Sequence, residues 1–178
     1  MSRRIPSLLC TLALAVTAGL FTAGPAHAAP LDLTCAPPSS NVTSYNPPLT
    51  LSTTGTVQVD TTVAYGPCVS ASHPAIVSGL RQTSFPVADG CNDLLGSGTI
   101  TYTITWNTGQ TSAITTNFTA TVAGAAFVVV ETGTITSGLF AGDTIVQNFT
   151  GPSTNITLCL LGLGTVPNIY AVGTVAIT

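Results

Sequence analysis

The sequence predicts an all-β protein, most simply an antiparallel β-sandwich, and three observations support this prediction. Apolar residues alternate with polar ones from Thr50 onward, which is the pattern of strands that bury one face. No long stretch shows the period of 3.6 residues that an amphipathic helix requires. Clusters of Gly, Pro, Asn and Ser separate the alternating segments at short intervals, as they do in all-β domains.

Residues 1–28 are typical of a cleaved secretory signal peptide. The pair Arg3-Arg4 supplies the positive start, an apolar stretch runs from Leu8 to Phe21, and Ala26-His27-Ala28 is a small-x-small cleavage site. The apolar stretch is interrupted and falls short of the roughly 20 residues that cross a membrane. We therefore expect one exported, extracellular domain over 29–178 that is free of the membrane after cleavage.

The clearest strands are 56–65 and 98–106, and the second leads through a turn at 107–110 into a returning strand at 111–121. The alternation also predicts strands at 125–136, 143–149, 155–161 and 169–177, and weaker strands at 31–34, 49–54 and 76–85. The proline-rich stretch 36–48 is expected to be a loop. About seven to nine short strands without helices favour a sandwich that is immunoglobulin-like in the broad sense. A Greek-key barrel or a jelly roll is the alternative.

Four cysteines follow the signal peptide, and an even number in an exported protein predicts two disulfides. Three pairings are open, of which we favour Cys35–Cys68 with Cys91–Cys159. This pairing ties the N-terminal region to itself and a later loop to a late strand. No C-x-x-C pair occurs, so we predict no metal site, and nothing in the sequence calls for another cofactor.

The chain is thinly charged, with 5% charged residues where about 25% is usual. It contains no Lys, and Arg81 is the only strong base after the signal peptide. Nucleic-acid binding is excluded, because it needs a cluster of basic residues. Polarity comes instead from 29 threonines after residue 28. The row Thr99, Thr101, Thr103 and Thr105 is expected to form a wet strand face.

Residues for catalysis are scarce. A nucleophile and base could only be His73 with Ser70 or Ser72, and we interpret His73 as a loop residue. Glu131 is the only glutamate, and its Val-rich strand suggests a solvent-facing or edge position. We therefore predict no catalytic residues and no enzyme.

Two further groups could bind a ligand. The segment 89–93 brings two aspartates and an asparagine together as a calcium loop would, but it lacks the spacing of an EF-hand, so we interpret it as a turn. Trp106 and Tyr102 could stack on a sugar ring if they were exposed. The alternation instead places both with Ile100 and Ile104 on the core face.

The runs 103–112, with W-x-x-G-x-x-S, and 136–144, with S-G-x-F-x-G-D, together with the Ala, Thr and Gly bias, resemble an uncharacterised family of small secreted proteins of actinomycete-type bacteria. The resemblance implies export and carries no active-site residues over. In physical terms both runs are turns.

Taken together, the sequence predicts a secreted, non-enzymatic protein with a structural or binding role at the cell envelope or in the medium. Its partner would be a polysaccharide or an envelope protein, and self-association through open strand edges is a further expectation. The alternatives are a carbohydrate-binding module and, in a different class, a secreted hydrolase or inhibitor that uses His73 or an exposed loop.

Overall fold

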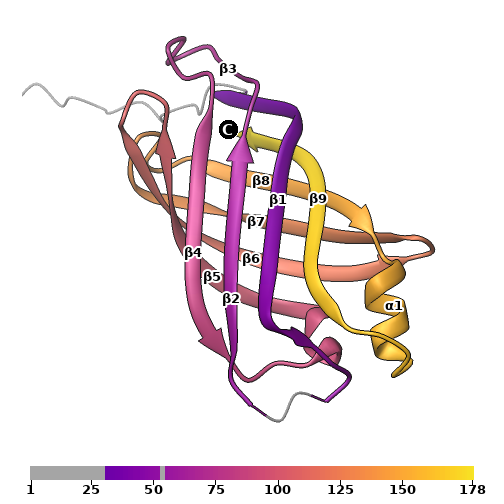
Figure 1. Ribbon diagram of the computed structural model, residues 1–178. Helices are drawn as coiled ribbons and strands as arrows, with labels where there is room; N and C mark the ends of the chain where they lie inside the picture. Colours follow the sequence, from indigo (N-terminus) through magenta and orange to yellow (C-terminus); the bar gives the residue numbers. More distant parts are fainter. Residues whose placement is uncertain (1–30, 53–54) are drawn as a thin grey trace, which may run out of the picture.

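A computed structural model describes residues 31–52 and 55–178 as a closed antiparallel barrel of eight long strands (Figure 1). The predicted signal peptide lies outside the described residues. The elements in chain order are β1 (Leu33–Leu49), β2 (Val57–Tyr65), β3 (Cys68–Ser70), β4 (Gly79–Val87), η1 (Cys91–Leu94), β5 (Gly96–Trp106), β6 (Thr111–Ala123), β7 (Ala126–Gly138), β8 (Thr144–Pro152), α1 (Thr154–Leu160) and β9 (Val166–Ile177).

The predicted sandwich is wrong, and the barrel alternative fits better. Each long strand pairs with the next one along the chain, and β9 returns to pair with β1, which closes the sheet. The short strand β3 adds to β1 at one end. Alternation marks one buried face per strand, and this is common to sandwiches and barrels. Only the β1–β9 pairing tells the two apart.

The proline-rich stretch that was expected to be a loop forms most of β1. Its prolines are tolerated because they fall where the pairing with β9 is interrupted, between Cys35 and Ser39 and again between Ser44 and Leu49. Proline has no N–H to donate, and such irregularities are places in a sheet where no donor is needed. Between them, residues 39–44 pair with β9 without a break.

The strand predicted at 155–161 is also wrong, because this segment is helix α1. Ile156 and Cys159 are its buried residues, and a spacing of three places both on one face of a helix. The weak strand predicted at 49–54 is not formed over the residues described there, since β1 ends at Leu49.

The barrel has two different ends (Figure 1). We call the end with β3 and the Cys35–Cys68 disulfide the β3 end, and the end with η1, α1 and the Cys91–Cys159 disulfide the helical end. Both disulfides join the cysteine pairs favoured from the sequence. At the helical end the bond ties η1 to α1.

The β3 end is filled by large side chains. The ring of Trp106 is 2% exposed, packs edge-on against Phe140 at 5.7 Å between centroids, and lies 6.3 Å from the ring of Tyr65. Its Nε1 donates a hydrogen bond of 2.8 Å to Ser112 Oγ. A side chain at position 79 would meet this indole, since a Cβ there would lie 2.7 Å from Trp106 Cε3.

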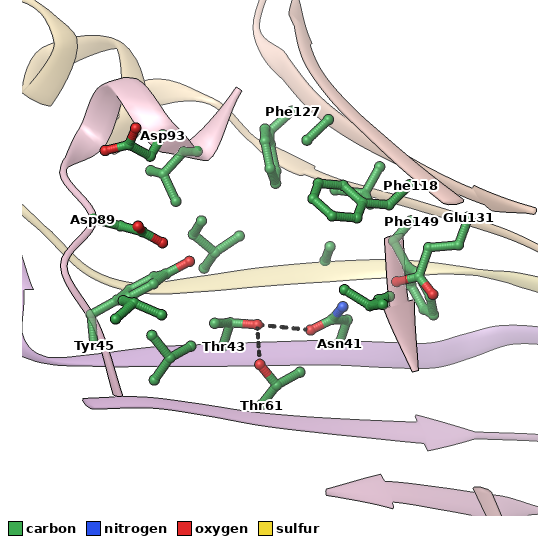
Figure 2. Close-up of a pocket in the computed structure, with 18 of the residues that line it drawn as sticks. Asn41, Thr43, Tyr45, Thr61, Asp89, Asp93, Phe118, Phe127, Glu131 and Phe149 are labelled. Carbon is green, nitrogen blue, oxygen red and sulfur yellow. Dashed lines mark hydrogen bonds between the residues drawn. The ribbon is translucent and has the colours of Figure 1, made fainter. Parts of the chain in front are cut away.

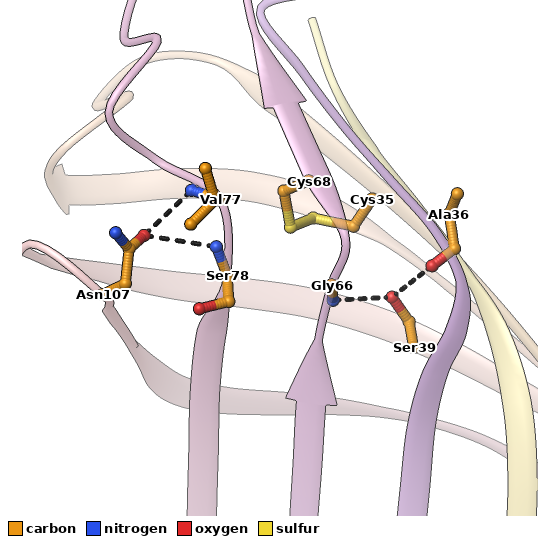
Figure 3. The surroundings of a disulfide bond; sticks show 8 residues. All are labelled: Cys35, Ala36, Ser39, Gly66, Cys68, Val77, Ser78 and Asn107. Atoms are coloured by element: carbon orange, nitrogen blue, oxygen red, sulfur yellow. Dashed lines mark hydrogen bonds between the residues drawn. A yellow bond between two sulfur atoms is a disulfide. The ribbon is translucent and has the colours of Figure 1, made fainter.

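Side-chain hydrogen bonds hold the connections around the Cys35–Cys68 disulfide (Figure 3). Ser39 Oγ donates to the Ala36 carbonyl and accepts from the Gly66 N–H, both at 2.9 Å. Asn107 Oδ1 accepts from the N–H groups of Val77 and Ser78. The β3 end is therefore closed both by packing and by polar contacts.

Candidate functional site

The half of the barrel toward the helical end contains a cavity of about 230 Å³. Strands from all around the barrel contribute to it, and η1 lies beside its outer end (Figure 2). Ligand pockets for drug-sized molecules typically measure about 300–1,000 Å³. The cavity therefore suits a smaller molecule.

The wall of the cavity is mainly apolar and rich in aromatic rings. Phe118, Phe127 and Phe149 come from three successive strands, and Tyr45 and Phe85 come from the other side of the barrel. Figure 2 shows the rings of Phe118 and Phe127 between the acidic residues at one end of the cavity and Glu131 at the other. Such a wall favours a ligand that is apolar over most of its surface.

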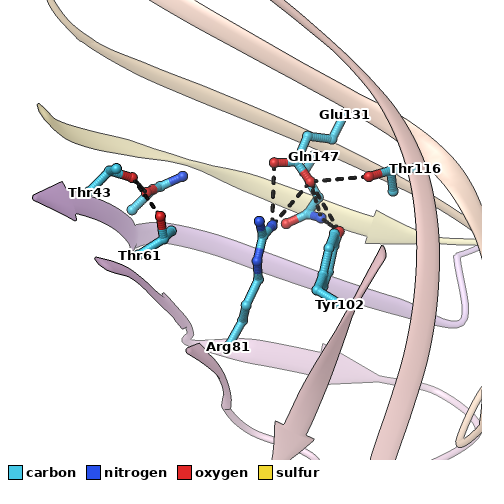
Figure 4. Close-up of polar contacts among 8 residues, drawn as sticks. Thr43, Thr61, Arg81, Tyr102, Thr116, Glu131 and Gln147 are labelled. Carbon is cyan, nitrogen blue, oxygen red and sulfur yellow. Dashed lines mark hydrogen bonds and ion pairs between the residues drawn. The ribbon is translucent and has the colours of Figure 1, made fainter. Parts of the chain in front are cut away.

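The inner end of the cavity is formed by a polar layer that crosses the middle of the barrel (Figure 4). Glu131 is 3% exposed, and the Arg81 Nη1 lies 3.4 Å and 3.3 Å from its two carboxylate oxygens. Its Oε2 also accepts hydrogen bonds from Tyr102 OH at 3.1 Å, Gln147 Nε2 at 3.2 Å and Thr116 Oγ1 at 3.5 Å. Gln147 Nε2 donates to Tyr102 OH as well.

Arg81 and Glu131 form a buried ion pair whose charges compensate each other. The guanidinium carbon of Arg81 lies 3.7 Å from the centre of the Tyr102 ring, so the cation is also stabilised by the aromatic face. The Nε of Arg81 is buried and has no hydrogen-bond partner among the described residues. Buried donors are rarely left without a partner, and Arg81 lines the cavity.

A second polar group lies on β1 and β2, next to the strand that carries Arg81. Thr43 Oγ1 donates to Asn41 Oδ1 at 3.2 Å and lies 3.1 Å from Thr61 Oγ1 (Figure 2). All three residues line the cavity. Polar side chains therefore face the cavity from β1 and β2 as well as from β4 and β7.

The cavity reaches solvent at the end of β4 and along η1. Its exposed lining residues are Phe85, of which 46% is accessible, Asp89 and Asp93. The neighbouring strands β4 and β5 pair only through Gly79 with Trp106 and Leu80 with Thr105. Beyond Leu80 they separate, and this leaves the barrel open on the side of Phe85.

Burial changes the acid–base behaviour of several groups at the site. Desolvation raises the pKa of the Tyr45, Tyr65 and Tyr102 phenols, so each stays protonated to higher pH than a free tyrosine. At the mouth, partial burial and the nearby Asp93 carboxylate raise the pKa of Asp89. Asp93 Oδ2 itself accepts a hydrogen bond of 2.8 Å from the Gly90 N–H.

The residues considered for ligand stacking do not form an exposed platform. Trp106 is buried at the β3 end, and Tyr102 belongs to the polar layer with its ring beneath Arg81. The predicted threonine face is formed: Thr99 Oγ1 donates to Asn117 Oδ1, and Thr101 pairs with Thr115 across the outer surface of β5 and β6.

His73 and its neighbouring serines lie outside the cavity. Ser70 Oγ accepts a hydrogen bond of 2.9 Å from the backbone N–H of His73, and the imidazole ring packs edge-on against Phe140 at 5.1 Å. The hydrogen bond between Ser70 and His73 therefore stabilises a backbone turn and does not involve the imidazole. Within residues 31–52 and 55–178, no group of three or more His, Cys, Asp or Glu side chains is placed to hold a metal ion.

Sequence reasoning missed the polar layer, and the interpretation of Glu131 as solvent-facing is wrong. The available signal was the alternation within β7, because Glu131 has the same parity as Phe127 and Val129, which also face inward. Gln147 likewise has the parity of Ile145 and Phe149 on β8. Polar side chains usually lie at the surface, and this expectation was given more weight than the inward position of Glu131 in the alternation.

Over residues 31–52 and 55–178, no helix combines the length and apolar character needed to cross a membrane. No protein-family model, curated protein or solved structure matches the chain, so the cavity is interpreted from its own geometry.

Proposed function

We propose that this is an exported binding protein that holds one small, mainly apolar molecule inside its barrel. The observation that carries the proposal is the aromatic-walled cavity of about 230 Å³ in the half of the barrel toward the helical end. An apolar molecule that moves from water into such a cavity gains about 25 cal/mol for each Å² of apolar surface that it buries. The signal-peptide pattern and the two disulfides support the exported location.

Binding fits the lining of the cavity better than catalysis does. Among the described residues that line it there is no His, Cys, Ser or Lys. Glu131, which could have acted as a base, already accepts hydrogen bonds from four side chains. A carboxylate held in this way is suited to fixing Arg81 in place.

A neutral fluorescent probe provides the test. N-phenyl-1-naphthylamine should gain fluorescence when titrated with the secreted protein, with saturation at one site. Ala120→Phe should abolish the gain, because Ala120 lines the cavity and a phenyl group there would fill it.

Thr119→Phe is the matched control, since Thr119 lies next to Ala120 on β6 and is exposed on the outer face. The proposal predicts that this variant still binds the probe as the unmodified protein does. Equal binding by both variants, or no binding by the unmodified protein, would refute a cavity-bound ligand.

A further inference from the structure

We propose that the ligand is an uncharged molecule with a carbonyl oxygen at one end, and that this oxygen lies against Arg81 while the apolar part fills the aromatic-walled half of the cavity. This inference rests on the proposed function and specifies the class of ligand for the same site. It follows from the charged side chains that line the cavity and from the unused N–H of Arg81, which is one of them.

Arg81 contacts the Glu131 oxygens through Nη1 alone, and its Nε, buried on a residue that is 7% exposed, has no partner among the described residues. An arginine side chain offers N–H donors only and cannot accept a hydrogen bond. The complementary group on a ligand is therefore an oxygen that accepts.

The Arg81 cation already has the Glu131 carboxylate as its counterion inside the barrel. A ligand carboxylate placed there would add a second anion to a site with one cation. Taking a charge out of water costs several kcal/mol unless an opposite charge compensates it. A carbonyl oxygen can accept the same hydrogen bond without that cost.

Asp89 and Asp93 line the entrance, so the charged side chains of the cavity are one cation and three anions. An anionic ligand would be repelled both at the entrance and at the polar layer. An ammonium group would be attracted by the entrance but would meet Arg81 at the inner end. A neutral molecule avoids both conflicts.

Four compounds of equal chain length test the inference: 2-octanone, octanoate, octylammonium and n-octane. Each is titrated calorimetrically and by displacement of N-phenyl-1-naphthylamine from the secreted protein at pH 7. We expect 2-octanone to bind at least about tenfold more tightly than octanoate. It should also bind more tightly than n-octane, which lacks the oxygen.

In the Glu131→Gln variant the preference for 2-octanone over octanoate should weaken or reverse. The substitution removes the counterion of Arg81, so a ligand carboxylate can take its place, and the affinity for octanoate relative to 2-octanone should rise about tenfold or more. If this variant does not fold, Asp89→Asn provides a milder change at the mouth and should raise the affinity for octanoate about twofold. Asp60→Asn, on the outer face of β2, is the control of equal charge and should change neither affinity.

The outcomes separate the two proposals. Tighter binding of octanoate or of octylammonium than of 2-octanone by the unmodified protein would overturn the inference and leave the proposed function standing. Equal binding of n-octane and 2-octanone would overturn the role of Arg81. If neither the probe nor any of the four compounds binds, the proposed function itself fails, and the inference fails with it.

Discussion

The β3 end and the helical end of the same barrel differ in packing although their strands carry the same alternation. At the β3 end the inward side chains of Trp106, Tyr65 and Ile114 belong to one buried hydrophobic cluster. At the helical end phenylalanines also point inward, but small residues such as Ala120 and Ala171 lie among them, and together they surround an open space.

The difference lies in how the strands are joined. Near Trp106 the strands β4 and β5 are hydrogen-bonded, and beyond Leu80 they separate. The interior of an eight-stranded barrel is just wide enough for its own side chains to fill or to hold one small ligand. The end of the β4–β5 pairing at Leu80 gives the helical half the wider opening. The polar layer around Glu131 marks the transition between the two halves.

The largest expected effect comes from removing a packed ring. Trp106→Ala should reduce the free energy of unfolding by about 3–5 kcal/mol, because the indole is fully buried and its loss leaves a cavity. Phe85→Ala should reduce it by less than about 1 kcal/mol, because that ring is already 46% exposed at the mouth. Urea unfolding of both variants measures the difference. Equal losses would show that the two halves are packed alike.

The two disulfides allow a second comparison. On loop entropy alone, removal of Cys91–Cys159, with a separation of 68 residues, should cost about 4.4 kcal/mol, and removal of Cys35–Cys68, with a separation of 33, about 3.7 kcal/mol. Paired Cys→Ala variants studied by urea unfolding give both values.

The same two variants should differ more clearly in binding. Loss of Cys91–Cys159 frees η1 beside the mouth and should weaken binding of the fluorescent probe, whereas loss of Cys35–Cys68 should leave it unchanged. The reverse result would place the ligand at the β3 end.

A smaller effect is expected from pH. Burial raises the pKa of the Tyr65 phenol above its value of about 10 in the unfolded chain. Above about pH 10 the unfolded chain therefore releases this proton while the folded protein retains it. Stability should fall as the pH rises, by about 1.4 kcal/mol per pH unit for this one phenol.

Tyr65→Phe isolates this contribution. The Tyr65 hydroxyl is buried close to the side chains of Arg81 and Gln147, which favour its ionised form, so its removal should change the free energy of unfolding at pH 7 by only about 1 kcal/mol. Urea unfolding at pH 9, 10 and 11 should show a shallower loss of stability for the variant. An unchanged slope would mean that Tyr65 titrates normally in the folded protein.

Local features were predictable from the sequence. Alternation and turn chemistry predict the hairpin of β5 and β6, the turn at 107–110 and the threonine face. Each of these features is determined by residues that are close together in the sequence. Burial of Trp106 and Tyr102 also follows, because they share parity with isoleucines on the same strand.

Closure of the barrel and the cavity were not predictable in this way. Closure depends on contacts such as Val42 opposite Tyr170, which are far apart in the sequence and produce no local pattern. The cavity depends on the place where β4 and β5 separate, and alternation carries no information about strand spacing. Arg81 and Glu131 are single charges on opposite sides of the barrel, and only the fold brings them together.

The central claim, that the helical half of the barrel takes up a small molecule, is tested most directly by NMR of protein labelled at its alanine methyl groups. In a titration with 2-octanone we expect saturable shifts for Ala120 and Ala171, which line the cavity. Ala113 and Ala176, which lie on the outer face, should not shift. Shifts confined to the outer alanines, or no shifts at all, would contradict this account of the cavity.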